Sequence, residues 1–264
     1  MLESASPMSE PMSDDLGAPV PRTRPPRRIV SLVPSLTESV AVSGPGLLVG
    51  ATDWCTHPAD LVVRRVGGTK SPDLEAVRQC APDLVLANAE ENRPADIAAL
   101  RADGIAVWVT NPRTLAQAFT SLSRMLSACG CGVPPWVDAA RLAWSSTYDC
   151  SPPRWTAVVP VWRRPWMVLG SQTFAGDVLR RLGVGNAYAG APDRYPKVTV
   201  EEMRTAGADL VVLPDEPYAF SAHDGPEAFP GLPVAVVSGR YLTWYGPSLL
   251  EARDVLEAQL ARLL

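Results

Sequence analysis

One sequence pattern occurs twice, without a gap and 126 positions apart, and it constrains the fold more than any other feature. Residues 74–86 and 200–212 both read as a short helix, a tight turn and a buried strand. Five aligned pairs are identical, namely Glu75/Glu201, Arg78/Arg204, Asp83/Asp209, Leu84/Leu210 and Val85/Val211. Helix–turn–strand units of any parallel α/β domain converge on such a pattern, so that alternative stays open. The repeat favours two related α/β lobes, which would leave a ligand cleft between them.

Strands and helices alternate along both halves of the chain, as in parallel sheets with covered faces. Between the halves, residues 114–129 have apolar side chains at helical spacing, two prolines interrupt the pattern, and 136–148 reads as helix again. We therefore expect an α/β fold of two Rossmann-like lobes joined by a long connecting helix. The expected parts are a disordered N-terminal tail over 1–27, an N-terminal lobe over 28–112, a helical connector over 113–150 and a C-terminal lobe over 151–264.

Composition excludes several classes of protein. The net charge is −4 and no long basic run interleaves with aromatic residues, so nucleic acid is not an expected partner. No apolar run approaches the roughly 20 residues of a membrane span, so no membrane insertion is expected. Residues 1–28 contain no apolar signal-peptide core, which predicts a cytoplasmic location for the sequence as written. A different start codon would make an extracytoplasmic location the expectation.

The cysteines and histidines of the chain give little indication of a disulfide, metal or catalytic site. Five cysteines form an odd count, which argues against a disulfide framework, and only two histidines are present. The loop holding Asp53, Cys55 and His57 is the one arrangement that could serve a metal-assisted hydrolase. Neighbouring side chains in an extended loop point in alternating directions, so a structural loop is the favoured interpretation. No catalytic residue, metal site or cofactor is therefore predicted.

Aromatic residues gather in the loops that follow strands. Both halves contribute them, and the set comprises Trp54, Trp166, Tyr195, Tyr218, Tyr241, Trp244 and Tyr245. Loops at the carboxyl ends of parallel strands would line the expected cleft, where aromatic rings suit a large, flat and partly apolar ligand. Ordinary core packing is the alternative for any one of these rings.

The order of several segments resembles the helical-backbone metal receptor family, the cobalamin- and siderophore-type substrate-binding proteins of ABC importers. The resemblance covers roughly residues 28–264 and rests on segments 28–38, 50–54, 68–75, 81–85 and 198–201. It implies two lobes joined by one long rigid helix, with the ligand held between them. It also implies that the protein is not an enzyme and that its ligand is a metal chelate, most simply cobalamin or another corrinoid.

The resemblance also assigns roles to residues. Trp54 and Tyr195 match aromatic ligand contacts of the family, and Trp166 and Tyr241 match them approximately. Thr69 and Asn88 stand where the family has two further aromatic contacts. The expected ligand-binding residues are Trp54, Asn88, Glu90, Asn92, Arg93, Trp166, Tyr195, Arg240, Tyr241 and Trp244.

Glu75 and Glu201 match the surface glutamates, one in each lobe, that dock such receptors onto an ABC permease. A solvated helix face, or an acid favoured by the helix dipole, is the alternative for both. Three other functions stay open at this point: a siderophore or haem binder, a cytoplasmic hydrolase using the Asp53–His57 loop, and an interaction module that has lost its ligand.

Overall fold

The computed structural model describes residues 12–21, 24–147 and 152–262. The described chain forms two compact units. The first takes the described residues up to Asn111 together with Ser123–Val133, and the second takes Pro112–Leu122 and the described residues from Pro134 onward. No helix in the described ranges is long and apolar enough to cross a membrane.

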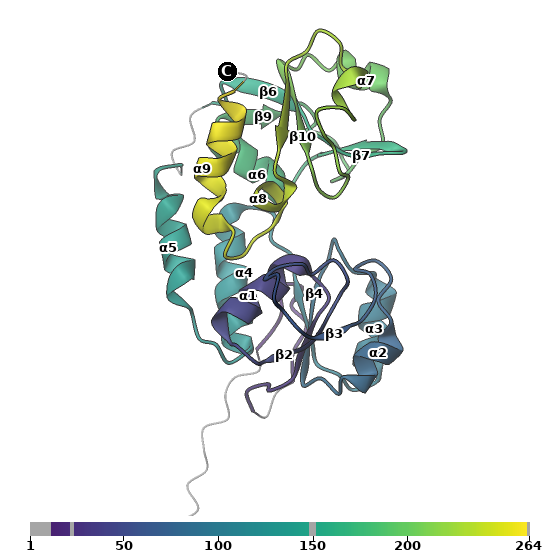
Figure 1. Ribbon diagram of the computed structural model, residues 1–264, viewed down its shortest axis with the longest axis vertical. Helices are drawn as coiled ribbons and strands as arrows, with labels where there is room; N and C mark the ends of the chain where they lie inside the picture. The colour runs from purple at the N-terminus through teal and green to yellow at the C-terminus, as the bar shows by residue number, and fades with distance from the viewer. Residues whose placement is uncertain (1–11, 22–23, 148–151, 263–264) are drawn as a thin grey trace, which may run out of the picture. The chain divides into compact units, whose positions relative to one another are not determined.

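The first unit contains a five-stranded parallel sheet in the order β3-β2-β1-β4-β5. Its strands are β1 (Ile29–Ser31), β2 (Leu48–Ala51), β3 (Arg64–Arg65), β4 (Leu84–Asn88) and β5 (Val107–Thr110). Its helices are α1 (Pro34–Ser43), α2 (Leu74–Gln79) and α3 (Pro94–Ala102). Alternate strand residues such as Val30 and Val85 pack with α2 and α3, and α1 lies on the other side of the sheet (Figure 1). This alternation is what a sheet buried on both faces requires.

The second unit contains a four-stranded parallel sheet in the order β11-β10-β6-β9 and the antiparallel hairpin β7–β8. Its strands are β6 (Trp155–Val158), β7 (Pro160–Arg163), β8 (Trp166–Val168), β9 (Val184–Asn186), β10 (Leu210–Pro214) and β11 (Val234–Val237). Its helices are α6 (Phe174–Arg181), α7 (Val200–Arg204), α8 (Gly239–Thr243) and α9 (Leu249–Leu260), with short 3₁₀ turns at Ser145–Thr147 and Pro226–Ala228. Two α/β lobes with parallel sheets are therefore confirmed.

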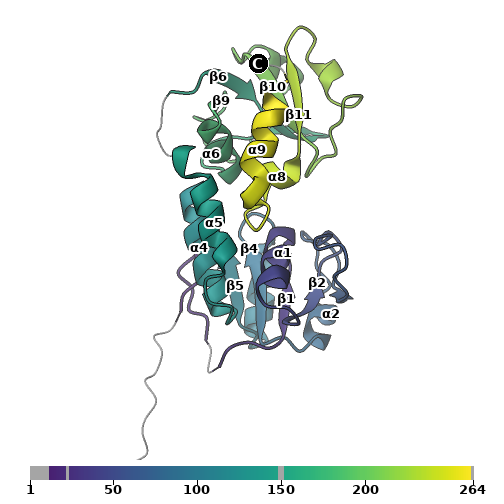
Figure 2. The ribbon, with the colours of Figure 1, turned by 60° about the vertical axis from the view of Figure 1, so that its left-hand side comes forward.

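The two helical stretches predicted for the connector are α4 (Leu115–Ala128) and α5 (Pro135–Ala143). Gly130 and Gly132 separate them, both in the left-handed backbone region that glycine adopts without strain. Residues of α4 up to Leu122 belong to the second unit and the rest to the first. In the second unit α5 runs back along the start of α4 (Figures 1 and 2), where Arg141 stacks over the ring of Phe119 at 5.6 Å.

The repeated pattern has the same structure in both units. The aligned residues Ala81 and Gly207 both occupy the left-handed region, with φ of 42° and 70°. Asp83 accepts the backbone N–H groups of Arg27 and Arg28 beside β1, at 2.8 and 3.0 Å. Its counterpart Asp209 accepts the Thr156 N–H in β6 at 2.7 Å. The duplicated motif is therefore a helix, a left-handed turn and a carboxylate that ties two parallel strands together.

The prediction that residues 1–27 form a disordered tail is wrong for residues 12–21. There Asp14 and Val20 are each only 2 % exposed, and Asp14 pairs with Arg101 at 2.7 Å. The composition of the tail as a whole is polar and rich in proline, but the Asp14 and Asp15 carboxylates pair with Arg101 and Arg124 of the first unit. Residues 1–11 and 22–23 lie outside the described residues.

Candidate ligand-binding edges

Trp54 stands in the loop that leaves the carboxyl end of β2 in the first unit. Its side chain is largely exposed, at 67 %, although tryptophan is among the most apolar residues by area. The loop is anchored because the Asp53 N–H donates to the Gly67 carbonyl at 2.9 Å. Trp54 is therefore an exposed aromatic surface on a fixed loop at the carboxyl edge of the first sheet.

Asn88 and Asn92 form a hydrogen-bonded pair at the end of β4, where both are almost fully buried. The Asn88 N–H donates to Asn92 Oδ1 at 2.9 Å. Asn88 Oδ1 accepts the N–H groups of Glu90 and Glu91 at 2.7 and 3.0 Å. Asn92 Nδ2 donates to the Thr69 carbonyl at 2.9 Å. Both amides hold loops together, and the sequence prediction had placed them against the ligand.

Charged side chains lie on the loops next to Asn88 and Asn92. Lys70 donates to the Glu90 carbonyl, which joins the loop after β3 to the loop after β4. Arg93 is exposed and pairs with Asp96 at 2.9 Å in the first turn of α3. The first unit therefore presents one large ring and several charged side chains at the same edge of its sheet.

The predicted hydrolase loop does not assemble catalytic machinery. Cys55 is fully buried, and its sulfur lies 3.0 and 3.1 Å from the hydroxyls of Thr37 and Thr52. Burial raises the pKa of the Cys55 thiol, which disfavours the nucleophilic thiolate. His57 Nδ1 instead contacts the neighbouring Thr56 hydroxyl at 3.1 Å. Among the described residues no group of three His, Cys, Asp or Glu side chains could hold a metal ion.

Aromatic rings form a continuous cluster at the carboxyl edge of the second unit. Trp166 stacks on Phe220 with ring centroids 5.9 Å apart and packs edge-on against Phe229 at 5.8 Å. Tyr218 lies 4.6 Å from Phe220 and 5.7 Å from Trp162. We call these five residues the aromatic cluster. It lies where the β7–β8 hairpin follows β6 and a loop follows β10.

Sequence reasoning did not include Trp162, Phe220 or Phe229 of the aromatic cluster, and Trp162 is the exposed one of the three. It lies in β7, 41 % of it is exposed, and its indole N–H donates to the Arg164 carbonyl at 3.2 Å. The adjacent Arg163 pairs with Asp224 and Glu227 and stacks over Trp166 at 5.4 Å.

The predicted residues of α8 are packed against one another. Arg240 lies over the rings of Tyr241 and Trp244 at 5.2 and 5.6 Å. Trp244 is only 9 % exposed, and its indole N–H donates to Glu216 at 3.1 Å. Burial and the neighbouring Asp215 carboxylate raise the pKa of Glu216. Tyr241 stays partly exposed, so it offers more surface to a ligand than Trp244 does.

Tyr195 is half-buried in the segment that leads from β9 to α7. The Gly170 N–H donates to the Arg194 carbonyl at 2.7 Å, and a Cβ atom at Gly170 would lie 2.0 Å from the Asp193 carbonyl oxygen. Only glycine fits so close to another backbone. This contact fixes the segment that carries Tyr195 beside the end of β8.

The two predicted docking glutamates both lie in first helical turns and are exposed. Glu75 follows the N-cap Asp73 of α2, and its side chain is 66 % exposed. Glu201 follows the capping box of α7, in which Thr199 and Glu202 exchange hydrogen bonds. Because the capping is done by other residues, neither glutamate is needed to start its helix.

Sequence comparison finds distant relatives. No protein-family model matches the chain. A vitamin B12-binding protein of Photorhabdus laumondii is 25 % identical over 195 residues, which cover 71 % of this chain and 70 % of that protein. A vitamin B12-binding protein of Pectobacterium carotovorum is 22 % identical over 90 % of both chains.

Structural comparison agrees on the fold. A periplasmic vitamin B12-binding protein of Vibrio cholerae superposes with a TM-score of 0.73 and 19 % identity, covering 90 % of this chain and 98 % of that one. A periplasmic haem-binding protein solved with two haems has a TM-score of 0.73 and 24 % identity, covering 91 % and 99 %. The expected cytoplasmic location is contradicted by this comparison, because both of these structural neighbours are periplasmic proteins.

Proposed function

We propose that this chain is a class III substrate-binding protein of the helical-backbone metal receptor family, and that it binds a metal chelate with a large flat ring, most simply a corrinoid such as cobalamin. In this proposal it delivers the ligand to an ABC permease and catalyses no reaction. The relatives and structural neighbours are themselves binding proteins. A haem is the alternative ligand of the same kind, since both are planar macrocycles around a metal.

The observation that carries the proposal is the exposure of tryptophan at a carboxyl edge in each unit. Trp54 is 67 % exposed in the first unit and Trp162 is 41 % exposed in the second. An indole on an anchored loop leaves a large apolar area in water unless a ligand covers it. Stacking on a macrocycle would remove that area from water and needs no precise hydrogen-bond match.

The packing divides the predicted residues into two roles. We propose that Trp54, Trp166, Tyr195 and Tyr241 contact the ring, with Trp162 added to them. Glu90, Arg93 and Arg240 would meet its polar substituents. Asn88, Asn92 and Trp244 are buried and bonded within their units, and we propose that they act by holding the loops.

Glu75 and Glu201 remain the proposed contacts with the permease. Both are exposed, neither caps its helix, and they lie at aligned positions of the repeated motif. One carboxylate in each unit would orient the receptor on basic side chains of a permease. Exposed charges of this kind contribute more to the rate and geometry of association than to affinity.

The test is a titration of the full chain with cyanocobalamin, cobinamide, haem and a ferric siderophore, followed by tryptophan fluorescence and thermal unfolding. A ligand at 100 times its Kd should stabilise the protein by about 2.7 kcal/mol. Trp54→Ala should weaken binding about tenfold or more, because one stacking wall is lost, while the unfolding midpoint stays unchanged.

Trp155→Ala is the matched control. Trp155 is also partly exposed, at 38 %, but it begins β6 and so lies at the amino edge of the second sheet. It should leave the affinity unchanged. The proposal fails if none of the four ligands changes either signal, and an equal loss of affinity in both variants would remove the role given to Trp54.

A further inference from the structure

Residues 12–21, which we call the N-terminal strap, fold back on themselves before the first sheet begins. The Asp14 N–H donates to the Ala18 carbonyl at 2.9 Å and the Val20 N–H donates to the Met12 carbonyl at 2.8 Å. Asp14 Oδ1 accepts the N–H groups of Leu16 and Ala18, both at 2.9 Å. An aspartate that opens a turn, followed by Gly17 with φ of 79°, is the local sequence signal for this shape.

The strap covers the β5 edge of the first sheet. β5 is the last strand of that sheet, so its outward N–H and C=O groups lack a neighbouring strand. The Asp15 N–H donates to the Val109 carbonyl at 3.0 Å. In return Val109 N–H donates to Asp14 Oδ2 at 3.3 Å, and Asn111 N–H donates to Asp15 Oδ2 at 3.0 Å. Two carboxylates therefore take the place of strand carbonyls.

Two arginines hold the carboxylates in place. The Asp14 side chain is fully buried and pairs with Arg101 of α3 at 2.7 Å. The Asp15 side chain is 11 % exposed and pairs with Arg124 of α4 at 2.8 Å. Arg124 also lies over the ring of Trp108 in β5 at 5.6 Å. The Arg101 and Arg124 side chains stay 35 % and 41 % exposed, so each pair joins a buried carboxylate to a guanidinium that still reaches water.

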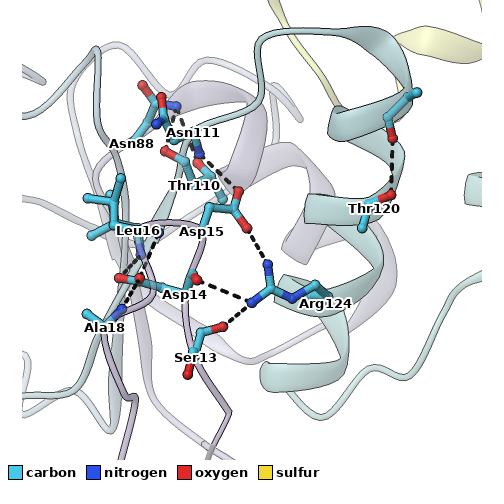
Figure 3. A network of polar contacts seen from close by, with 12 residues as sticks. Ser13, Asp14, Asp15, Leu16, Ala18, Asn88, Thr110, Asn111, Thr120 and Arg124 are labelled. Atoms are coloured by element: carbon cyan, nitrogen blue, oxygen red, sulfur yellow. Dashed lines mark hydrogen bonds and ion pairs between the residues drawn. The ribbon is translucent and has the colours of Figure 1, made fainter.

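The same contacts continue to Asn111, Thr110 and Asn88, as Figure 3 shows. Asn111, held by Asp15, follows Thr110 at the carboxyl end of β5. The Thr110 carbonyl accepts from Asn88 Nδ2 at 3.1 Å. Asn88 Oδ1 in turn holds the N–H groups of Glu90 and Glu91. A continuous path of hydrogen bonds and backbone thus joins the strap to the loop after β4.

We propose that Asp15 of the N-terminal strap is a positioning residue for the ligand-facing loop Glu90–Arg93, acting through Asn111, Thr110 and Asn88. The claim that this loop faces a ligand rests on the proposed function, whereas the effect of Asp15 on the loop does not. The strap would then contribute to ligand binding by the first unit. A truncated chain that starts at β1 would lack the strap.

The test compares amide hydrogen exchange in the full chain and in Asp15→Ala. Losing the carboxylate should speed exchange about tenfold at Asn111, Glu90 and Glu91, because their hydrogen bonds open more often. Exchange in β1 and β2 should stay unchanged. Asp254→Ala, which removes an exposed carboxylate from α9, is the charge-matched control and should change nothing in the loop.

Asp15→Asn separates positioning from charge. Its amide oxygen still accepts the Asn111 N–H, so it should restore protection at Glu90 and Glu91 even though the ion pair with Arg124 is lost. The proposal is overturned if Asp15→Ala leaves the loop unchanged, or if it speeds exchange equally in every strand of the unit. If Asp15→Ala does not fold, the test uses Asp15→Asn alone. Amide exchange at Glu90 and Glu91 of Asp15→Asn that is as fast as in the chemically unfolded chain would then overturn the proposal.

Ligand binding supplies the second readout. If the chain binds cyanocobalamin or haem, affinity should fall in Asp15→Ala and recover in Asp15→Asn. If it binds none of the four probes, the proposed function fails, while the exchange data still decide the role of Asp15.

Discussion

The two units share a skeleton but complete their carboxyl edges differently. In the first unit a buried pair of amides, Asn88 and Asn92, fixes the loops through directional hydrogen bonds. In the second unit the aromatic cluster around Trp166 and Phe220 does so through ring packing. Hydrogen bonds weaken steeply with angle, whereas ring contacts tolerate several arrangements. We therefore expect the loops of the first edge to keep a single conformation. We expect the aromatic side chains of the second edge to shift more easily when a ligand binds.

Removing Trp166 should have the largest effect on stability. Trp166→Ala deletes a ring that packs against Phe220 and Phe229, and should lower the free energy of unfolding by about 3 kcal/mol. Urea denaturation of the variant measures this loss. Trp54→Ala is the control, since that ring is exposed and should change stability by less than about 0.5 kcal/mol. Equal losses would show that the second edge is not held by ring packing.

Removing Asn92 should have the next largest effect. Asn92→Ala leaves the Asn88 N–H and the Thr69 carbonyl without their partner, and should lower the free energy of unfolding by about 2 kcal/mol. The second unit offers a counterpart in Asn186, which bonds the Leu169 and Gly170 carbonyls but is only half-buried. Asn186→Ala should cost less in the same denaturation experiment. The reverse order would contradict the contrast between the two edges.

A change at the turn of the repeated motif should have the smallest effect, and it tests the shared skeleton. Ala81 has a φ of 42°, which an L-residue adopts with strain, and its counterpart in the second unit is Gly207. Ala81→Gly relieves this strain but also increases the entropy of the unfolded chain. The net result should be a rise of about 0.5 kcal/mol in the free energy of unfolding. Gly207→Ala should lower it. Thermal unfolding of both variants checks the signs, and equal signs would refute the equivalence of the turns.

The element order could be predicted from the sequence because hydrophobic periodicity and glycine turns are local signals. The strap could not, because the carboxylates of Asp14 and Asp15 pair with Arg101 and Arg124, which lie 87 and 109 residues away in the sequence. Composition reports only that such a segment is polar. The short Asp-Asp-Leu-Gly turn was the one local sign of order.

The sequence alone does not separate residues that would face a ligand from residues that hold a loop, for a physical reason. A polar residue after a parallel strand can face a ligand or satisfy the backbone of its own loop, and both tasks favour the same residue types. Asn88 and Asn92 perform the second task in the structure. An aromatic residue there can likewise stack on a ligand or fill a gap, and Trp244 lies buried against Glu216. Only the folded contacts separate these alternatives.

The aspartates that tie paired strands also shape how each unit folds. Asp83 reaches back 55 and 56 residues to the chain beside β1, and Asp209 reaches back 53 residues to β6. Closing a loop costs an entropy that grows only with the logarithm of its length, so the two closures are nearly equal in cost. Neither of these strand pairs can form until its loop has closed, and we expect this long-range pairing to slow the folding of both units.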